Sequence, residues 1–266
     1  MVRRPSGWSD HLRTPRLLHR QGLRVGTRPT HGRHGNSIPV LLTHHGRREW
    51  GFATAVLILL GVPAAIYGQW WAVIILFLGW FVVAGFFRDP LGRRPATDDP
   101  QDLVSPADGR ISAVEKVPSH EATGDGPAIV VRIFLSVLDV HLNRAPCDAT
   151  VESVTHRPGR YLDARTEESA KVNESNLVRF ITDDQVMIGV RQVSGAIARR
   201  IVCPIAKGDR VARGARYGMI KFGSTTELII PDTPGASVHV KVGDRTTGGV
   251  TILARLEPES KSEPEG

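Results

Sequence analysis

The longest apolar stretch of the chain runs from Gly51 to Phe87, 37 residues without a charged side chain. A helix in a soluble core is apolar on one side only, so a stretch this long that is apolar on all faces predicts membrane-embedded sequence. Pro63, Gly68 and Gln69 interrupt it and leave two halves near the lower limit of about 17 residues for a span. The pattern therefore predicts a helical membrane hairpin over 50–87.

Arginines flank both ends of this stretch, Arg47 and Arg48 before it and Arg88 after it. Cationic flanks prefer the cytoplasmic side of a membrane, so positive charge at both ends predicts a hairpin with both ends inside. The alternative is one longer, tilted span, which would place the rest of the chain on the other side. The hairpin implies attachment to the cytoplasmic face of a membrane.

Downstream of this stretch the pattern changes to short runs rich in Val and Ile, separated by Gly, Pro and Asp. These runs include "AIVVRIFLSV", "QVMIGVRQV", "YGMIKF" and "TELIIP". Such spacing is typical of an all-β sandwich or barrel. The segment "KGDRVARG" (207–214) resembles "VGDRTTGG" (242–249), which indicates pseudo-symmetric halves. We expect a mainly β, barrel- or sandwich-like body behind an α-helical membrane hairpin.

The distribution of charged, polar and apolar residues predicts the remaining segment boundaries of the chain. The whole chain has 266 residues and a net charge of +7, but residues 1–49 carry ten Arg against two acids. We expect a basic, mostly disordered tail over 1–49, a Pro- and charge-rich linker over 88–102, a catalytic domain over 103–256 and a disordered tail over 257–266. Because a membrane segment follows the basic tail, we expect it to meet an anionic membrane surface and not a nucleic acid.

The dipeptide Gly223-Ser224 in "KFGSTTEL" is either a turn between two strands or a peptide bond that is cleaved. A serine hydroxyl needs an adjacent base, itself oriented by a third group, to act as a nucleophile. Among the four histidines of the body, His141 follows the most apolar run, in "SVLDVHLNRAP". Asp108 lies in the tight turn "SPADGRI" and is the best orienting acid. Taken singly, Asp108 is typical of a turn residue, and His141 of a surface histidine or a hydrogen-bonded histidine at the end of a strand.

Together, "SPADGRI", "FLSVLDVHLNRAP" and "KFGSTTEL" resemble the three signatures of phosphatidylserine decarboxylase proenzymes. "HRPGRY" and "ARRIVC" resemble the short bacterial subfamily. The resemblance covers roughly residues 84–256, with the segments in the same order and at similar spacing. A Gly-Ser pair alone is weak evidence, whereas the three segments behind a membrane hairpin are specific.

The resemblance implies that Ser224 attacks the carbonyl of Gly223 and that elimination and hydrolysis leave a pyruvoyl group at position 224. Glycine has no Cβ to block this attack. His141 would accept the proton and Asp108 would hold its ring. The products would be a β chain, residues 1–223, and an α chain, residues 224–266, which stay together as a heterodimer and could assemble into a higher oligomer.

The resemblance also implies the reaction and the substrate. The pyruvoyl carbonyl would form an imine (Schiff base) with the amine of phosphatidylserine and accept electrons as CO₂ leaves, as pyridoxal phosphate does in other enzymes. The product would be phosphatidylethanolamine. His141 could return a proton to the product carbon.

Two positions depart from the family pattern. Many relatives carry a second histidine three residues after the first, where this chain has Arg144. A guanidinium suits a phosphate or carboxylate, so Arg144 is a candidate contact for the substrate anion, with a strand-end ion pair as the alternative. The short subfamily often has Arg after the Gly-Ser pair, where this chain has Thr225, and this leaves the subfamily open.

Two other classes of protein share parts of the pattern. A membrane-anchored barrel-sandwich adaptor would explain the anchor and the repeated Gly-Asp turns, but adaptors carry a long helical hairpin inside the body. A serine peptidase would use the same Asp108, His141 and Ser224, but the Gly-x-Ser-x-Gly pattern is absent. The sequence shows no cluster of metal ligands, so we expect no metal.

Overall fold

The computed structural model of the chain describes residues 41–196, 200–221 and 224–257. Most of the predicted N-terminal tail, the end of the C-terminal tail and the predicted cleavage residue Gly223 therefore lie outside the described residues.

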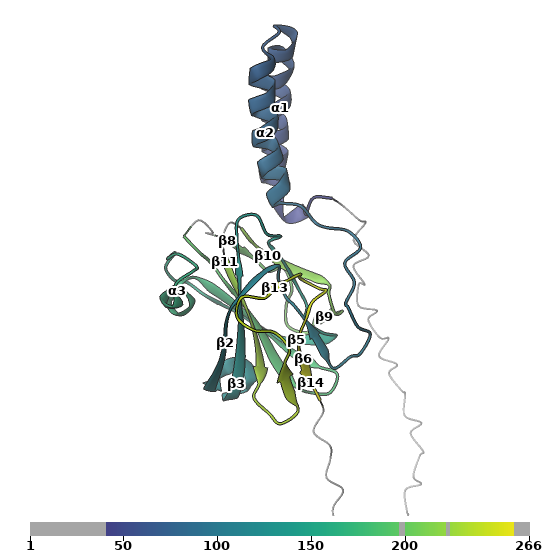
Figure 1. Ribbon diagram of the computed structural model, residues 1–266, viewed down its shortest axis with the longest axis vertical. Coiled ribbons are helices and arrows are strands. Elements are labelled where there is room, and N and C mark those ends of the chain that lie inside the picture. The colour runs from purple at the N-terminus through teal and green to yellow at the C-terminus, as the bar shows by residue number, and fades with distance from the viewer. Residues whose placement is uncertain (1–40, 197–199, 222–223, 258–266) are drawn as a thin grey trace, which may run out of the picture. The chain divides into compact units, whose positions relative to one another are not determined.

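Two apolar helices open the described chain (Figure 1). The 3-10 turn η1 (His44–Gly46) leads into α1 (Arg47–Ile66), and α2 (Trp70–Phe86) follows after a break at Tyr67–Gln69. The break falls where the sequence is interrupted, and Gly68 adopts a φ of 69° that favours glycine. The segment His44–Ile66 is long and apolar enough to cross a membrane by length and composition, whereas α2 is a shorter apolar helix.

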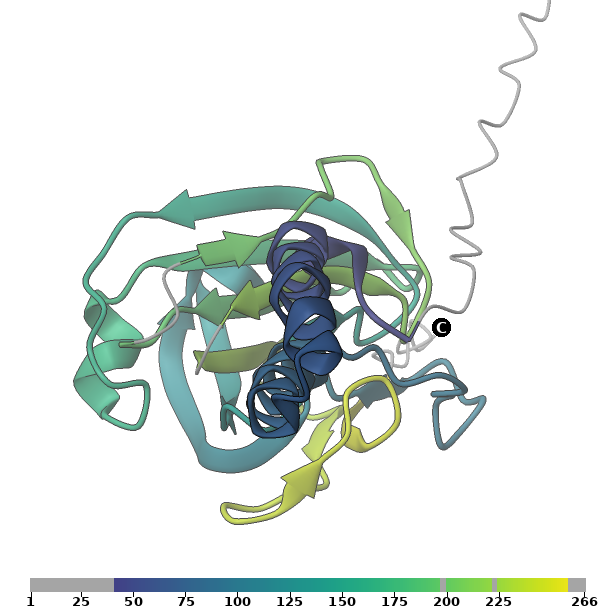
Figure 2. The same ribbon diagram turned by 90° about the horizontal axis from the view of Figure 1, so that it is seen from above.

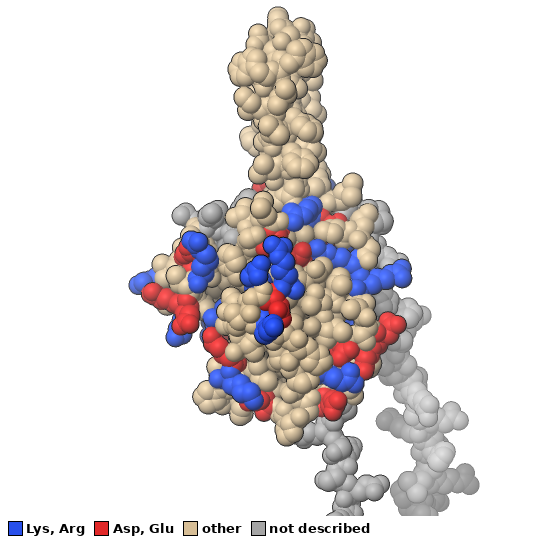
Figure 3. All heavy atoms as spheres, viewed as in Figure 1, with Lys and Arg blue, Asp and Glu red and all other residues tan. Residues whose placement is uncertain are grey.

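The two helices pack against each other, and Trp80 Nε1 on α2 donates a hydrogen bond of 2.8 Å to Thr54 Oγ1 on α1. Their other faces expose large apolar side chains, including Ile66, Trp70 and Val82. Figure 3 shows this surface free of charged side chains until the base of the hairpin. Exposed apolar surface of this extent marks a membrane or protein interaction site.

Within the described residues, the body contains fourteen strands, one further 3-10 turn and one short helix. They are β1 (Asp102–Val104), β2 (Gly109–His120), η2 (Glu121–Thr123), β3 (Gly126–Leu135), β4 (Leu142–Arg144), β5 (Ala149–Arg157), α3 (Glu167–Val172), β6 (Ser175–Thr182), β7 (Met187–Val193), β8 (Arg200–Val202), β9 (Arg210–Val211), β10 (Arg216–Lys221), β11 (Ser224–Pro231), β12 (Ala236–Val238), β13 (Arg245–Thr246) and β14 (Ile252–Leu256).

The strands form one large sheet and two small ones, all with antiparallel pairing. The large sheet has eight strands in the order β13-β2-β3-β11-β7-β6-β5-β9, and it curls into a half barrel (Figure 2). The small sheets have the orders β1-β14-β12 and β4-β10-β8. The predicted mainly β, barrel- or sandwich-like fold behind apolar helices is confirmed.

The strand β11 lies at the centre of the large sheet and is buried on both faces. Leu228 and Ile230 point into the main core, and Ile229 between them packs on the opposite face against Leu177 and Ala122. A strand covered on both faces reads as a continuous apolar run, which is what "ELIIP" shows. Burial of each such side chain contributes about 1.5–3 kcal/mol, so β11 is held firmly where its first residue, Ser224, begins.

The two halves of the body repeat the same backbone pattern. The amide of Arg144 donates to the carbonyl of Pro106 and the amide of Val104 donates to that of Pro146, each at 2.9 Å. A pseudo-twofold axis therefore relates two equivalent segments, "SPADGRI" (105–111) and "APCDATV" (145–151), and it also relates these two hydrogen bonds.

The repeated Gly-Asp turns belong to the same symmetry. Gly208 and Gly243 have φ values of 90° and 97°, and their amides donate at 2.8 Å to the carbonyls of Val151 and Ile111, respectively. The two small sheets are also equivalent, since β4-β10-β8 corresponds to β1-β14-β12. The predicted pseudo-symmetric halves are therefore present, and they extend well beyond the segments in which the sequence shows them.

The long polar segment 157–174 covers the outer face of the large sheet. Thr225 Oγ1 on β11 donates to the carbonyl of Ala164 at 3.2 Å, and Arg191 on β7 donates to the carbonyl of Ala170 at 3.0 Å. Asn173 closes the loop through both of its side-chain groups, bonded to the backbone of Leu162. This loop, which lacks periodicity in the sequence, is thus fixed beside the start of β11.

Candidate active site

Three neighbouring strands bring two of the predicted site segments to one end of the large sheet. Ser224 pairs with Leu135, the last residue of β3. Arg110 pairs with Phe134, so Gly109 at the start of β2 lies opposite Leu135 on the other side. Ser224 and the turn that holds Asp108 are therefore at the same edge, one strand apart.

Gly109 allows this close packing. A Cβ atom at this position would lie 2.2 Å from the carbonyl oxygen of Phe134, and its φ of 153° is one that side chains rarely adopt. Only glycine fits here, which explains the Asp-Gly pair in "SPADGRI" as a requirement of the strand packing.

Ser224 has no exposed surface, and its Oγ forms no hydrogen bond with any residue that the structure describes. Two residues further on, Thr226 Oγ1 accepts a bond of 3.0 Å from Asn143 Nδ2. Leaving a buried hydroxyl unpaired costs about 1–3 kcal/mol, and such groups in folded proteins call for an explanation. An unpaired hydroxyl at this position fits a residue that reacts and is converted into another group.

His141 is the only one of the four histidines of the body without exposed surface. It lies just before β4, where the amide of Ile220 donates to its carbonyl at 3.1 Å. Its ring packs against Phe86 at the end of α2, with centroids 4.4 Å apart. The ring of a predicted catalytic base thus lies against the last turn of the apolar hairpin.

The orientation of the His141 ring is set by the backbone. Its Nδ1 lies 2.9 Å from the carbonyl oxygen of Asp139. A carbonyl only accepts, so Nδ1 carries the proton and Nε2 of the neutral ring holds the lone pair. Burial lowers the pKa of His141 to about 4, although the carbonyl and the charge of Asp139 act in the opposite direction. The ring is therefore neutral near pH 7, which is the form a proton acceptor needs.

Asp108 is bonded to Arg93 and to the backbone. Both carboxylate oxygens face the Arg93 guanidinium, with Nη2 and Oδ2 2.7 Å apart, and Oδ1 accepts a bond of 2.8 Å from the amide of Gly248. The expected hydrogen bond from Asp108 to the His141 ring is not among the contacts of the described residues. The charge of Asp108 reaches the ring and raises its pKa, an effect much smaller than that of burial. The role of Asp108 in orienting His141 stays a prediction.

Comparison with the equivalent residue in the other half of the body shows which contacts of Asp108 belong to the turn and which are particular to Asp108. Its equivalent, Asp148, accepts a bond of 3.1 Å from the amide of Arg213, as Asp108 does from Gly248. This contact therefore belongs to the turn in both halves. Asp148 is exposed, whereas Asp108 is partly buried and paired with Arg93, so the arginine distinguishes the Asp108 half.

Arg144 is buried and bonded within the protein. Its Nη1 donates to the carbonyl of Gly214 at 2.9 Å and its Nη2 pairs with Asp89 at 3.3 Å. Asp89 also pairs with Arg216 at 2.6 Å. Burial lowers the pKa of Arg144 to about 10, which leaves it charged at neutral pH. The structure thus shows the ion pair that was the alternative for Arg144, and a contact with a substrate anion stays a prediction.

A buried chain of amide side chains ties β4 to the large sheet. Asn176 Nδ2 donates to Gln192 Oε1 at 2.9 Å, Gln192 Nε2 donates to Asn143 Oδ1 at 2.8 Å, and Asn143 donates to Thr226. This network connects β6, β7, β4 and β11 within two residues of both His141 and Ser224.

Sequence reasoning missed this network and two other contributors, Arg93 and Phe86. Asn143 was visible as a polar residue two positions after His141 in a buried segment. Arg93 lies in a linker where charged residues are expected to be solvated, and Phe86 lies in a run of apolar residues. Neither of these two carries a local signal for its contact.

Comparison with known proteins agrees with this arrangement. A family model described as phosphatidylserine decarboxylase matches residues 80–254. Three curated proteins named phosphatidylserine decarboxylase proenzyme are similar to the chain. The one from Magnetococcus marinus is 38% identical over 204 residues, 75% of this chain and 91% of its own. The one from Gluconacetobacter diazotrophicus is 43% identical over 173 residues, 64% and 75%. The one from Carboxydothermus hydrogenoformans is 39% identical over 210 residues, 79% and 96%.

The chain belongs to the phosphatidylserine decarboxylase family. The resemblance inferred from the three segments is confirmed, and family membership favours an enzyme over the adaptor and the peptidase. The region that matches the decarboxylase family begins within α2 and includes Asp108, His141 and Ser224. The residue that stacks on His141, Phe86, also lies inside it.

Proposed function

We propose that this protein is a self-processing, pyruvoyl-dependent decarboxylase that converts phosphatidylserine to phosphatidylethanolamine and CO₂. The observation that carries the proposal is the buried hydroxyl of Ser224, which has no hydrogen-bond partner among the described residues and lies directly after Gly223, at the start of a central strand. Its support comes from the family match and from the names of the curated relatives, which describe proenzymes acting on phosphatidylserine.

In self-cleavage, Ser224 Oγ attacks the carbonyl carbon of Gly223. The hydroxyl proton passes to Nε2 of His141, the C–N bond breaks as the C–O bond forms, and the freed nitrogen of residue 224 takes up a proton. Loss of the Cα proton then expels the carboxylate of Gly223. Hydrolysis releases ammonia and leaves a ketone at residue 224. The neutral His141 ring, with its lone pair on Nε2, suits the first proton transfer.

The pyruvoyl group supplies a carbonyl that takes the substrate amine and accepts the electron pair released as CO₂ leaves. The residues of this chain perform the remaining tasks. His141 holds a proton at Nε2 for return to the product carbon, and the burial of His141 and Ser224 limits competing reaction with water. The amide network through Asn143 keeps β4 and β11 in register, so that the base and residue 224 stay in place.

The apolar helices bring this chemistry to a lipid. Phe86, the last residue of α2, contacts the His141 ring, so the membrane-facing hairpin ends directly at the candidate base. Exposed Trp70 and Trp71 lie at the opposite end of the hairpin and suit a membrane interface. We infer a hairpin anchor on the cytoplasmic face, with the headgroup of the substrate at the depth of His141.

The test is the intact mass of the purified, denatured protein. Two fragments are expected, residues 1–223 and a 43-residue fragment whose first residue is a ketone-bearing pyruvoyl group instead of serine. The Ser224→Ala variant should remain one chain. Ser194→Ala is a matched control, because Ser194 is an equally buried serine directly after the neighbouring strand β7, and its Oγ is also unpaired within the described residues. A folded wild-type protein that stays intact would refute the proposal.

The basic tail makes a second, separable contribution to the proposal. We expect that deleting residues 1–46 weakens binding to anionic vesicles and that the loss shrinks as salt is raised, because exposed charges are screened. Cosedimentation with vesicles of phosphatidylglycerol measures this. Unchanged binding would exclude the tail as a membrane contact while leaving the decarboxylase untouched.

A further inference from the structure

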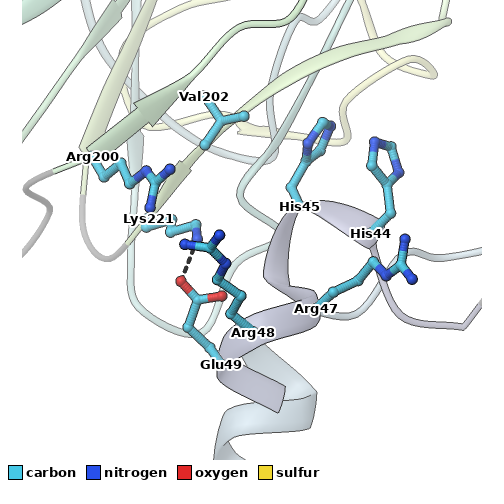
Figure 4. A pocket seen from close by; sticks show the side chains of 8 residues that line it. All are labelled: His44, His45, Arg47, Arg48, Glu49, Arg200, Val202 and Lys221. Carbon is cyan, nitrogen blue, oxygen red and sulfur yellow. Dashed lines mark hydrogen bonds and ion pairs between the residues drawn. The ribbon is translucent and has the colours of Figure 1, made fainter. Parts of the chain in front are cut away.

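A cavity of about 410 Å³ lies between the start of α1 and the edge of the small sheet β4-β10-β8 (Figure 4). Its volume falls in the range of roughly 300–1,000 Å³ typical of ligand sites. Eight residues line it: His44, His45, Arg47, Arg48, Glu49, Arg200, Val202 and Lys221.

The lining is strongly cationic. Four of the lining residues have cationic side chains, Arg47, Arg48, Arg200 and Lys221, and Glu49 is the only acid among the lining residues. The charges come from two parts of the chain far apart in sequence, the first turn of α1 and the strands β8 and β10. Like charges gathered around one cavity repel each other, so this arrangement favours an anion inside it.

Lys221 is the best-placed cation. Its side chain is only 7% exposed and forms an ion pair with Glu49, drawn as a dashed line in Figure 4. Its Nζ also lies 5.6 Å from the centre of the Phe87 ring. Glu49 thus pairs with Lys221. The lining contains no second acid that could neutralise its three arginines.

The backbone adds to the positive charge. α1 has 20 residues and follows the 3-10 turn η1, and the amide of Arg47 at its start donates to the carbonyl of His44. The N-terminal end of a helix carries the positive end of its dipole. The cavity therefore combines side-chain cations with the positive end of a helix, a combination that suits the oxygens of a phosphate.

The position of the cavity indicates where the phosphate comes from. It lies at the first turn of the apolar helix α1, which is the depth of phospholipid headgroups when that helix is in a bilayer. We propose that this cavity binds the phosphate group of an anionic phospholipid. The lining contains none of the residues assigned to the chemistry of Ser224, and the site needs no amine, so it goes beyond the proposed reaction.

The test uses native mass spectrometry of the full chain in detergent, titrated with phosphatidylglycerol or with zwitterionic phosphatidylcholine. Phosphatidylglycerol has no amine and cannot enter the proposed reaction, so the result is independent of decarboxylation. We expect saturable binding of phosphatidylglycerol that is tighter than that of phosphatidylcholine. The double variant Arg48→Gln/Arg200→Gln should weaken it at least tenfold. Glu49→Gln, which removes the acid, should strengthen it severalfold.

The matched control is Lys116→Gln/Lys207→Gln, which removes two positive charges from side chains that are 71% and 77% exposed and do not line the cavity. Binding that this control weakens as much as Arg48→Gln/Arg200→Gln does would overturn the site, because the effect would then be one of net charge. Inorganic phosphate at millimolar concentration should displace the lipid from the wild type. Phosphate binding without any lipid binding would assign the cavity to a free anion and refute the proposal.

Discussion

Protonation of His141 should cost the folded protein stability in a defined pH window. The ordinary pKa of histidine is 6.5 and burial lowers that of His141 to about 4. As pH falls below 6.5 the unfolded chain binds a proton at this ring and the folded chain does not. Stability is therefore fully present above pH 6.5 and is lost as pH falls toward 4. The full difference is about 3 kcal/mol, and roughly three-quarters of it is lost by pH 4.5.

The assay is thermal unfolding followed by tryptophan fluorescence, in detergent and with Ser224→Ala so that the chain stays whole. Other groups titrate in the same window, so wild-type His141 is compared with His141→Gln at pH 8 and at pH 4.5. The substitution changes packing equally at both pH values. The difference between the two proteins in their loss of melting temperature from pH 8 to pH 4.5 therefore measures the protonation of the His141 ring. Between pH 8 and pH 4.5, the melting temperature of the protein with His141 should fall by roughly 5–10 °C more than that of His141→Gln, given 2–4 °C per kcal/mol for a chain of this size.

Two results would refute the reasoning. A difference below 2 °C between the proteins would mean that the ring is protonated as readily in the folded chain as in the unfolded one. An additional loss that is already complete by pH 5.5 would mean that the pKa of the folded ring lies well above 4. The first result would also remove the argument that burial keeps the His141 ring neutral, and the second would reduce the effect of burial on its pKa.

Three further substitutions test the surroundings of the site. Asp108→Asn should slow self-cleavage, measured as the fraction of intact chain on a denaturing gel, while Asp148→Asn at the equivalent turn should not; equal effects would assign Asp108 to the turn alone. Gly109→Ala places a Cβ 2.2 Å from the Phe134 carbonyl oxygen and should cost about 1–3 kcal/mol, seen as a lower melting temperature; an unchanged value would contradict the packing described. Glu227→Gln removes the buried partner of two arginines and should cost about 3–5 kcal/mol in urea unfolding, and a cost under 1 kcal/mol would show that the carboxylate is not needed.

Much of the fold could be predicted because its signals are local. The break between the helices falls at the residues that interrupt the apolar run, and the run "YGMIKF" matches β10 to within one residue. The run "SVHVKV" was less informative, since only its first two residues belong to a strand, β12 (Ala236–Val238). Alternation in this segment reflects an edge that leaves His239 exposed, and the sequence does not show where pairing ends.

The sequence is enough to propose Ser224 and His141 as candidate site residues, but it does not show which residues surround and support them. Ser224 and His141 stand out because each combines a reactive side chain with an apolar neighbourhood. The pairing of Arg93 with Asp108 joins a linker to a turn, and Gln192 meets Asn143 across 49 positions of sequence. Such contacts depend on how the sheets pack against each other, and they cannot be predicted from local patterns in a single sequence.

The central position of β11 fixes the order in which this protein can mature. The bond proposed to break lies immediately before a strand that is paired along its whole length with β3 and along five residues with β7. A 43-residue fragment made separately would have to enter between two strands that have already closed on each other. We therefore expect that the fragment never exists as a free molecule and that cleavage follows folding. The proposed cleavage would then leave the two fragments of one translation product paired with each other through the large sheet.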